Sequence, residues 1–214
     1  MLKTNSSWSA KEMRADPKRY DHLLEGTGFS RPQLQAHLAL YEGYVKKLGE
    51  ISDRLGKSDR STANYSFGEY SELRRREPVA YNGVVLHELY FDALGRKGAT
   101  RPSEVVKERI AASYGGWEEW LKNMKAAGAS CHGWAMVVFD PVREKLATNL
   151  VQSEHHVGLF ANTPILIALD VWEHAYTLQF GINKAEYLKA FFEALDWDVV
   201  RRRLSGIDMT AGMG

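Results

Sequence analysis

The segment LIALDVWEHAYTLQF, which runs from Leu166 to Phe180, places ionisable residues directly after an apolar run. Asp170, Glu173 and His174 all fall within it. Ionisable groups beside apolar neighbours cost free energy unless a partner compensates them. A carboxylate at a strand end and an imidazole just beyond it are well placed to act as ligands, because a rigid element holds them. Taken alone, an Asp-x-x-x-His pair is more often a local hydrogen bond or a helix cap than a metal site.

Two further histidines lie among apolar residues of predicted helices. His37 precedes Leu38 on the apolar side of its helix, and His87 lies within NGVVLHELYF. A single such histidine is usually a core residue. Together with Asp170 and His174, however, the two would form a set of three imidazoles and one carboxylate. That set suits iron or manganese, would also suit zinc, and leaves room for a solvent ligand.

The elements that must position these residues begin with helices. The first helix is predicted to start after Ser30, a favourable N-cap, and residues 57–70 are predicted to form an irregular connection. Residues 71–95 are expected to form one helix or two, with a break at Pro78. A further pair of helices is expected on either side of Gly115.

After Ser130 the pattern changes to short strands. HGWAMVVFDPVREKLATNLVQ predicts two strands joined by a turn, TPILIALD predicts a third, and NKAEYLKAFFEALDWDVVRRRL predicts a single closing helix. The predicted fold class is α+β, with an N-terminal helical hairpin domain followed by a mixed α/β domain that contains a three-stranded antiparallel sheet. The predicted variable N-terminal segment, hairpin domain and α/β domain span residues 1–27, 28–98 and 99–214.

Composition argues against several classes of function. The 214 residues are 44% hydrophobic and 26% charged with a formal net charge of +1, so neither a nucleic-acid nor a membrane-surface partner is expected. No apolar run approaches the roughly 20 residues that span a bilayer, and no secretory-signal pattern is present. The single cysteine, Cys131, cannot form an internal disulfide, so a cytoplasmic location is expected.

Several stretches of the chain resemble one family. DVWEHAY, followed by NKAEYLKAFFEALDW, resembles the C-terminal signature of the iron/manganese superoxide dismutases. NGVVLHELYFDAL resembles the helix that carries the family's second metal ligand, and FSRPQLQAH resembles the helix that carries the first. HGWAMVV resembles the family's Gly-Trp strand start, with Trp134 matching. The resemblance covers roughly residues 28–204 and is strongest from residue 130 onward.

This resemblance implies a metal centre and a reaction. One iron or manganese ion per subunit would be held by His37, His87, Asp170 and His174. The implied reaction is the disproportionation of superoxide to dioxygen and hydrogen peroxide, carried out by a homodimer or homotetramer. Two other interpretations stay open. One is a protein of the same fold that binds metal with little dismutase activity, and the other is a zinc-dependent hydrolase with the same ligands.

The family also places a hydrogen-bonding group beside the metal-bound solvent. In iron-type members a Gln commonly lies four residues before the second ligand, where this chain has Gly83. The group is therefore expected from LVQSEHHVGLF, which resembles the archaeal-type stretch. Within it, His156 ranks first, Gln152 second and His155 third.

Other family positions differ in this chain. The gateway tyrosine, Tyr44, follows His37 by seven residues instead of eight, which on a regular helix leaves both side chains on one face. Tyr41 and Thr177 replace a His–Tyr pair that crosses the family's dimer interface.

The resemblance also implies roles at the edge of the site. Glu173 is expected to bond the ligand histidine of the partner subunit. Lys184 takes the position of the family's funnel arginine, where a cation would steer an anion toward the site. The aromatic residues expected in the lining or at the subunit contact are Trp134, Trp172, Tyr90, Phe91 and Tyr176.

Overall fold

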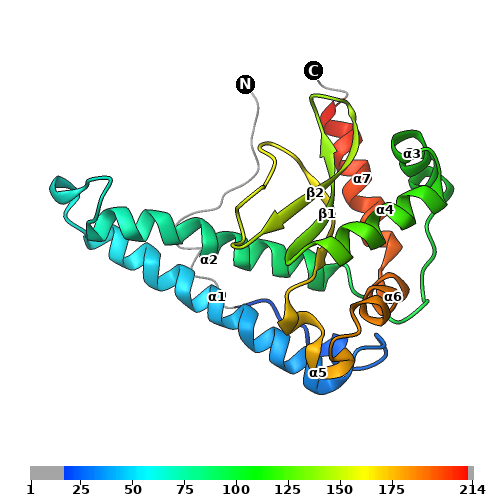
Figure 1. Cartoon of the computed structure of the whole chain (residues 1–214), viewed down its shortest axis with the longest axis horizontal. Coiled ribbons are helices and arrows are strands. Elements are labelled where there is room, and N and C mark those ends of the chain that lie inside the picture. The colour runs from blue at the N-terminus through cyan, green and yellow to red at the C-terminus, as the bar shows by residue number, and fades with distance from the viewer. Residues whose placement is uncertain (1–16, 212–214) are drawn as a thin grey trace.

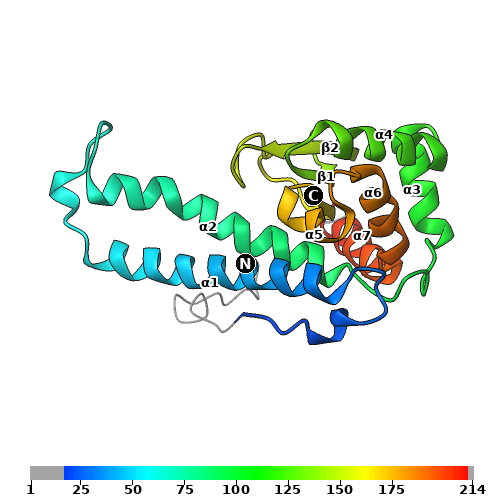
Figure 2. The ribbon, with the colours of Figure 1, turned by 60° about the horizontal axis from the view of Figure 1, so that its bottom comes forward.

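The computed structural model describes residues 17–211 of the chain, with side chains through Ile207. A helical hairpin extends from one side of a unit in which helices surround a small sheet (Figures 1 and 2). The chain reaches the hairpin through a short 3-10 turn over Asp21–Leu24. The predicted α+β class, with helices first and a three-stranded antiparallel sheet after them, is confirmed.

Helix α1 spans Arg31–Lys57 without interruption. It begins as the sequence predicted, because the Ser30 side chain accepts a hydrogen bond from the backbone N–H of Gln33. Positions four and three residues apart share a helical face. The continuous helix therefore turns His37, Tyr41 and Tyr44 toward the same side.

Helix α2 spans Glu69–Asp92 and packs along α1. The predicted break at Pro78 is wrong, since Pro78 lies inside the helix. A proline there removes one backbone hydrogen bond and crowds the carbonyl four residues earlier. Helix α2 continues because apolar residues on both sides of the proline pack against α1. This cluster consists of Leu48, Ile51, Leu55, Leu73 and Ala80.

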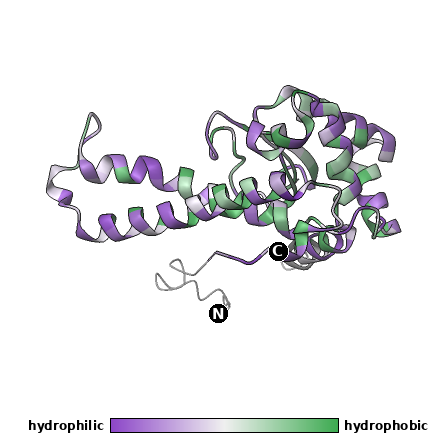
Figure 3. Cartoon of the chain, turned by 90° about the horizontal axis from the view of Figure 1, so that it is seen from below, coloured by the Kyte–Doolittle hydropathy of each residue, from purple (hydrophilic) through white to green (hydrophobic). Residues whose placement is uncertain are grey.

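The distal and proximal parts of the hairpin differ in polarity. Figure 3 shows mainly hydrophilic residues far from the sheet and hydrophobic ones where the two helices reach it. The main core contains residues from both helices and from the sheet, among them Leu34, Leu86 and Met136. The inner end of the hairpin is thus part of the same core as the sheet.

Helices α3 (Glu104–Tyr114) and α4 (Trp117–Ser130) meet at Gly115, whose φ of 84° lies in the left-handed region that glycine adopts easily. Strands β1 (Gly133–Asp140), β2 (Lys145–Gln152) and β3 (Ile165–Asp170) follow. The strand order is β2-β1-β3, with both pairs antiparallel. Every residue of β1 is buried, as expected for a central strand covered on both faces. Its Trp134 lies opposite Asp170 of β3.

The chain after β3 forms a 3-10 turn over Glu173–Ala175 and then helices α5 (Thr177–Phe180), α6 (Lys184–Ala194) and α7 (Trp197–Ala211). The predicted single closing helix is therefore two helices. The break falls at Leu195, whose extended backbone forms a bridge with Leu94 at the end of α2. None of the described helices is long and apolar enough to cross a membrane.

Candidate metal centre

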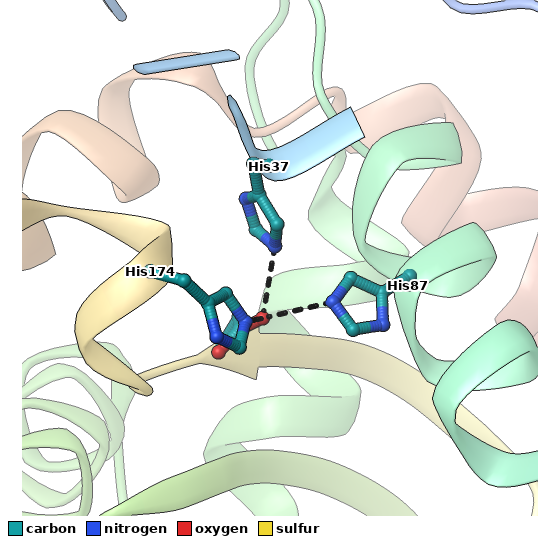
Figure 4. A group of neighbouring side chains, drawn as sticks. His37, His87 and His174 are labelled. Carbon is teal, nitrogen blue, oxygen red and sulfur yellow. Dashed lines mark hydrogen bonds and ion pairs between the residues drawn. The ribbon is translucent and has the colours of Figure 1, made fainter. Parts of the chain in front are cut away.

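The side chains of His37, His87 and His174 point toward one another (Figure 4), and with Asp170 they form one cluster from four separate segments. His37 comes from α1, His87 from α2, Asp170 from the end of β3, and His174 from the turn after it. Their potential ligand atoms all lie within 4.8 Å of one another. The Nε2 atoms of His37, His87 and His174 lie 3.0, 3.6 and 3.1 Å from one atom, Oδ2 of Asp170.

The carboxylate is held in a fixed orientation. The backbone N–H of Trp172 donates to Oδ1 of Asp170 at 3.0 Å, and the Tyr187 hydroxyl donates to the Asp170 carbonyl oxygen. Oδ2 is therefore left facing the three rings. The side chains of His87 and Asp170 are fully buried, whereas that of His174 is 29% exposed and forms the solvent-facing side of the cluster.

The protonation of His87 follows from its neighbour. Its Nδ1 lies 2.5 Å from the carbonyl oxygen of Gly83, which can only accept, so Nδ1 carries the proton. The Nε2 atom therefore bears a lone pair. It is buried and has no hydrogen-bond partner among the described residues. A buried, unsatisfied acceptor is costly, and a metal ion at the centre of the cluster would satisfy it. Three imidazoles and one carboxylate fit iron, manganese or zinc.

Electrostatics favour the ligand-ready protonation states of His37, His87 and Asp170, whereas the raised pKa of His174 favours its protonated form. Burial lowers the pKa of His37 and lowers that of His87 to about 3. Burial alone would raise the pKa of Asp170, but the neighbouring His174 and His37 outweigh it and hold the carboxyl well below its ordinary value. Neutral histidines and an ionised carboxylate are the forms that bind metal.

Acid is expected to destabilise the metal-free protein. Between pH 6.5 and 3 the unfolded chain protonates His87 and the folded chain does not, so stability falls as the pH falls below 6.5. The raised pKa of His174 works in the opposite sense. Its contribution to the stability of the folded chain is full below pH 6.5 and is lost as the pH rises above that value. We expect the unfolding midpoint to drop by about 4–8 °C between pH 6.5 and 5, as roughly 2 kcal/mol is lost.

Calorimetry of the chelator-treated protein measures this drop. His87→Gln is the matched variant, because it removes the group whose pKa differs between the two states, and its midpoint is expected to vary less with pH. A wild-type midpoint that stays constant or rises toward pH 5 would contradict the assignment.

A second chain of hydrogen bonds ends beside the cluster. The indole N–H of Trp134 donates to Nδ1 of His155 at 2.8 Å. Nδ1 is therefore the acceptor, and the proton of the neutral ring sits on Nε2, which lies 2.7 Å from the Tyr44 hydroxyl. Burial lowers the pKa of His155, which favours this neutral form. With its oxygen accepting from His155, Tyr44 keeps its own O–H free to donate into the pocket. The ring centres of Tyr44 and His87 lie 5.4 Å apart.

Three residues were candidates for the hydrogen-bonding group beside the metal-bound solvent. Their order in the sequence ranking differs from how close the structure brings them to the cluster. His155, ranked third, is buried and bonded to Tyr44. His156, ranked first, is half-buried and forms no such bond, and Gln152, ranked second, is exposed at the end of β2. The backbone explains the difference, because Ser153 has a φ of 63° and turns the chain directly after β2. That turn brings His155 toward the hairpin.

Known proteins similar to this chain belong to one family. A family model described as iron/manganese superoxide dismutases, C-terminal domain, matches residues 102–203. The chain is 38% identical to the iron superoxide dismutase of Aquifex aeolicus over 86% of this chain and 88% of that protein. The chain belongs to the iron/manganese superoxide dismutase family. It is also 32% identical to the iron enzyme of Cupriavidus metallidurans, over 92% and 96% of the two chains, and 32% identical to manganese superoxide dismutase 2 of Halobacterium salinarum, over 77% and 80%.

Tyr44, predicted from the resemblance as the gateway residue, lies between α1 and α2. Because α1 is regular, Tyr44 shares the face of His37 and lies against α2 at Gly83. A Cβ atom added to Gly83 would lie 2.6 Å from Cδ1 of Tyr44, well inside van der Waals contact. The same glycine supplies the carbonyl that orients His87.

Gly83→Ala is therefore expected to destabilise the protein by about 1–3 kcal/mol, because the Tyr44 ring must move to make room. The control is Gly43→Ala on α1, where an added Cβ meets nothing within 4 Å. That change is expected to be neutral or stabilising by about 0.5–1 kcal/mol, since alanine is the better helix former. Denaturant unfolding of both variants measures the difference. Equal stability of the two variants would show that Tyr44 does not pack on Gly83.

Tyr41 makes its polar contacts within the chain. Its side chain is buried, and its hydroxyl donates to Oε1 of Glu88 at 2.8 Å and accepts from the backbone N–H of Lys18 at 3.0 Å. Lys18 also pairs with Glu88 at 2.9 Å. Tyr41 thus fastens the N-terminal segment to the hairpin within one chain. Its predicted role at a dimer contact stays a prediction.

Glu173 and Lys184 both make contacts within the chain. Glu173 is exposed and lies 2.5 Å from Nε2 of His132, and its predicted contact with a partner subunit stays a prediction. The Lys184 ammonium donates to the Cys131 carbonyl oxygen at 2.9 Å and lies 5.8 Å from the centre of the Tyr176 ring.

The remaining predicted aromatic residues surround the cluster. The Tyr90 and Phe91 rings lie 5.1 and 4.8 Å from that of His37. Trp134 lies 5.0 Å from His87, and Trp172 lies 6.5 Å from His174. Tyr176 packs on Tyr187 instead, with 5.2 Å between ring centres. These rings give the cluster a largely apolar shell.

A pocket of about 240 Å³ opens onto the exposed side of the cluster. The residues that line it include Tyr44, His155, Trp172, His174, Arg76 and Glu154. A small molecule in this pocket therefore reaches His174 and the Tyr44 hydroxyl together. Lys184 is not among the lining residues.

Proposed function

We propose that this protein is a superoxide dismutase that converts two superoxide ions and two protons into one dioxygen and one hydrogen peroxide. The observation that carries the proposal is the convergence of three imidazole Nε2 atoms on one buried carboxylate oxygen, beside a pocket that also receives the Tyr44 hydroxyl. The family membership supports the same activity. Both iron and manganese enzymes are among its relatives, so the proposal does not choose between the two metals.

The proposed ligands are His37, His87, Asp170 and His174. When bound, iron or manganese would exchange single electrons with the substrate by alternating between its divalent and trivalent states. The protein supplies the remaining requirements. Asp170 offers a buried negative charge, and the Gly83 carbonyl fixes the His87 tautomer so that its lone pair points inward.

Proton supply is the proposed role of the Trp134–His155–Tyr44 chain. Trp134 fixes the His155 tautomer, and His155 in turn orients the Tyr44 oxygen. The Tyr44 hydroxyl proton then points toward the pocket, where the peroxide product must be protonated. Burial raises the pKa of Tyr44, which keeps the hydroxyl protonated at neutral pH.

Two alternatives give different results. A metal-binding protein of the same fold with little activity would take up iron or manganese yet leave superoxide decay near its spontaneous rate. A zinc hydrolase needs a carboxylate base beside bound water. The nearest acids are already paired, Glu154 with Arg76 and Glu173 with His132, which disfavours that alternative.

Product balance tests the proposal. The protein is stripped of metal, reloaded separately with iron, manganese or zinc, and supplied with superoxide while dioxygen and hydrogen peroxide are measured. We expect equal amounts of the two products with iron or manganese, and no acceleration with zinc, which has no second accessible oxidation state. Hydrogen peroxide without matching dioxygen would indicate a reductase, and uptake of both redox metals without acceleration would favour the inactive alternative.

A further inference from the structure

One ion pair lies in the lining of the pocket. Arg76, on α2, places Nη1 2.9 Å from Oε1 and 3.2 Å from Oε2 of Glu154. Glu154 belongs to the loop after β2 and directly precedes His155. The two side chains are 57% and 38% exposed, so the pair stands at the mouth of the pocket and not in its interior.

Arg76 is the permanent cation in this lining. The other ionisable lining residues are Glu154, Tyr44, His155 and His174. Lys184, the cation at the family's funnel position, donates to the Cys131 carbonyl instead. An arginine side chain stays charged at any physiological pH.

We propose that Arg76 draws the anionic substrate into the pocket, and that Glu154, by pairing with Arg76, sets the strength of this attraction. The proposal rests on the proposed function, because superoxide is the anion concerned. Within this ion pair, Arg76 would speed the entry of the substrate and Glu154 would slow it.

Distance and charge support this assignment. Arg76 precedes His87 by eleven residues, or about three turns of α2. Its charge is therefore carried by the same helix as one proposed ligand. Arg76 and Glu154 also line the same pocket as Tyr44. A small anion that moves from the mouth toward Tyr44 would therefore pass through the field of both charges.

A merely structural role for the pair makes a different prediction. If the ion pair served only to hold the loop that carries His155, removing either partner would loosen the loop and slow the enzyme. If the pair acts through charge, removing Arg76 slows entry and removing Glu154 speeds it. A structural role thus predicts that Arg76→Gln and Glu154→Gln change the rate in the same direction. A role through charge predicts changes in opposite directions.

The experiment measures kcat/KM for superoxide at several salt concentrations. At low salt we expect Arg76→Gln to lower kcat/KM about three- to tenfold, and Glu154→Gln to raise it about two- to threefold. Both effects should largely vanish by about 0.5 M salt, where screening acts within a few ångströms. Arg76→Lys, which keeps the charge, should stay within about twofold of the wild type at low salt.

The matched controls are Arg74→Gln and Glu77→Gln. These residues form an ion pair of 2.7 Å on the same helix but do not line the pocket. They carry the same change of charge at residues outside the pocket lining. We expect kcat/KM within about 1.5-fold of the wild type for both, as is usual for an exposed pair outside a site.

Azide binding gives a second readout that does not depend on turnover. Azide is a small monovalent anion, and its affinity for the iron-loaded protein is followed by optical titration. We expect weaker binding in Arg76→Gln and tighter binding in Glu154→Gln, again only at low salt. If the protein proved inactive toward superoxide, the proposed function would fail while this titration still decided the role of the pair. Changes of the same sign in both variants, or changes that salt does not reduce, would overturn the proposal.

Discussion

Asp170→Asn is expected to abolish metal retention. The variant replaces the one buried negative charge of the cluster with a neutral amide, whose NH₂ group cannot act as a ligand. Oδ2 of Asp170 is the atom on which all three imidazoles converge, and Asp170 is the one carboxylate in this cluster of described residues. We expect less than about one-tenth of the wild-type metal content after dialysis, and a fall in activity of at least about 100-fold.

The control for this loss is Asp140→Asn. Asp140 is also a buried aspartate at the end of a strand, and its Oδ1 accepts hydrogen bonds from the backbone of the turn that follows β1. An asparagine oxygen can accept the same bonds. We therefore expect wild-type metal content in this variant. Elemental analysis of both proteins, with circular dichroism to show that each is folded, makes the comparison. Full metal content in folded Asp170→Asn would exclude the proposed site.

His155→Ala is expected to slow turnover by about 10- to 100-fold without loss of metal. The variant removes the acceptor of the Trp134 N–H and the donor that orients the Tyr44 oxygen. Tyr44 then loses its fixed orientation, and proton delivery to the peroxide product slows. Since His155 is not one of the proposed ligands, metal content should match the wild type.

His156→Ala is the matched control, because it makes the same truncation one residue later, at a half-buried side chain outside the pocket lining. We expect activity within about threefold of the wild type, since neither the ligands nor the Trp134–His155–Tyr44 chain is touched. Steady-state rates and metal content of the two variants are compared at one pH. A larger loss of activity in His156→Ala than in His155→Ala would indicate that His156, which the sequence ranked first, supplies the hydrogen bond.

The sequence was informative wherever local spacing or local pattern determines the structure. Ser30 caps α1, short apolar runs form the strands, and the glycine between α3 and α4 adopts the left-handed conformation. The four candidate ligands were found the same way, because polar residues stood out in apolar stretches and matched a family signature. Their convergence could only be expected from that resemblance, since they lie on four separate segments.

The sequence was less informative where packing overrides local preference. Pro78 disfavours a helix locally, yet α2 continues because apolar residues on both sides of it pack against α1. Leu195 shows the opposite case. It lies in a good helical pattern but is drawn into a bridge with Leu94, which divides the closing helix. Neither outcome is visible in the residues next to the affected position.

The choice between His155 and His156 could not be made from the sequence for a similar reason. Adjacent residues in an irregular loop point in different directions, and the direction depends on a backbone turn at Ser153 that no glycine marks. The Tyr41–Glu88–Lys18 contacts were also missed, because they join segments that are far apart in the chain. The contact between Tyr44 and Gly83 was not predicted either, although the sequence singled out each of the two residues separately.

The most direct test of dismutase activity at this site is the rate of superoxide decay as a function of metal occupancy. Wild-type protein is prepared with iron, and separately with manganese, at several occupancies between zero and one ion per chain, and the decay of superoxide is followed directly. We expect a rate that rises linearly with occupancy from the spontaneous rate at zero, toward kcat/KM values in the diffusional range for at least one metal. A rate that stays at the spontaneous value with the site filled by either metal would contradict the proposed dismutase activity.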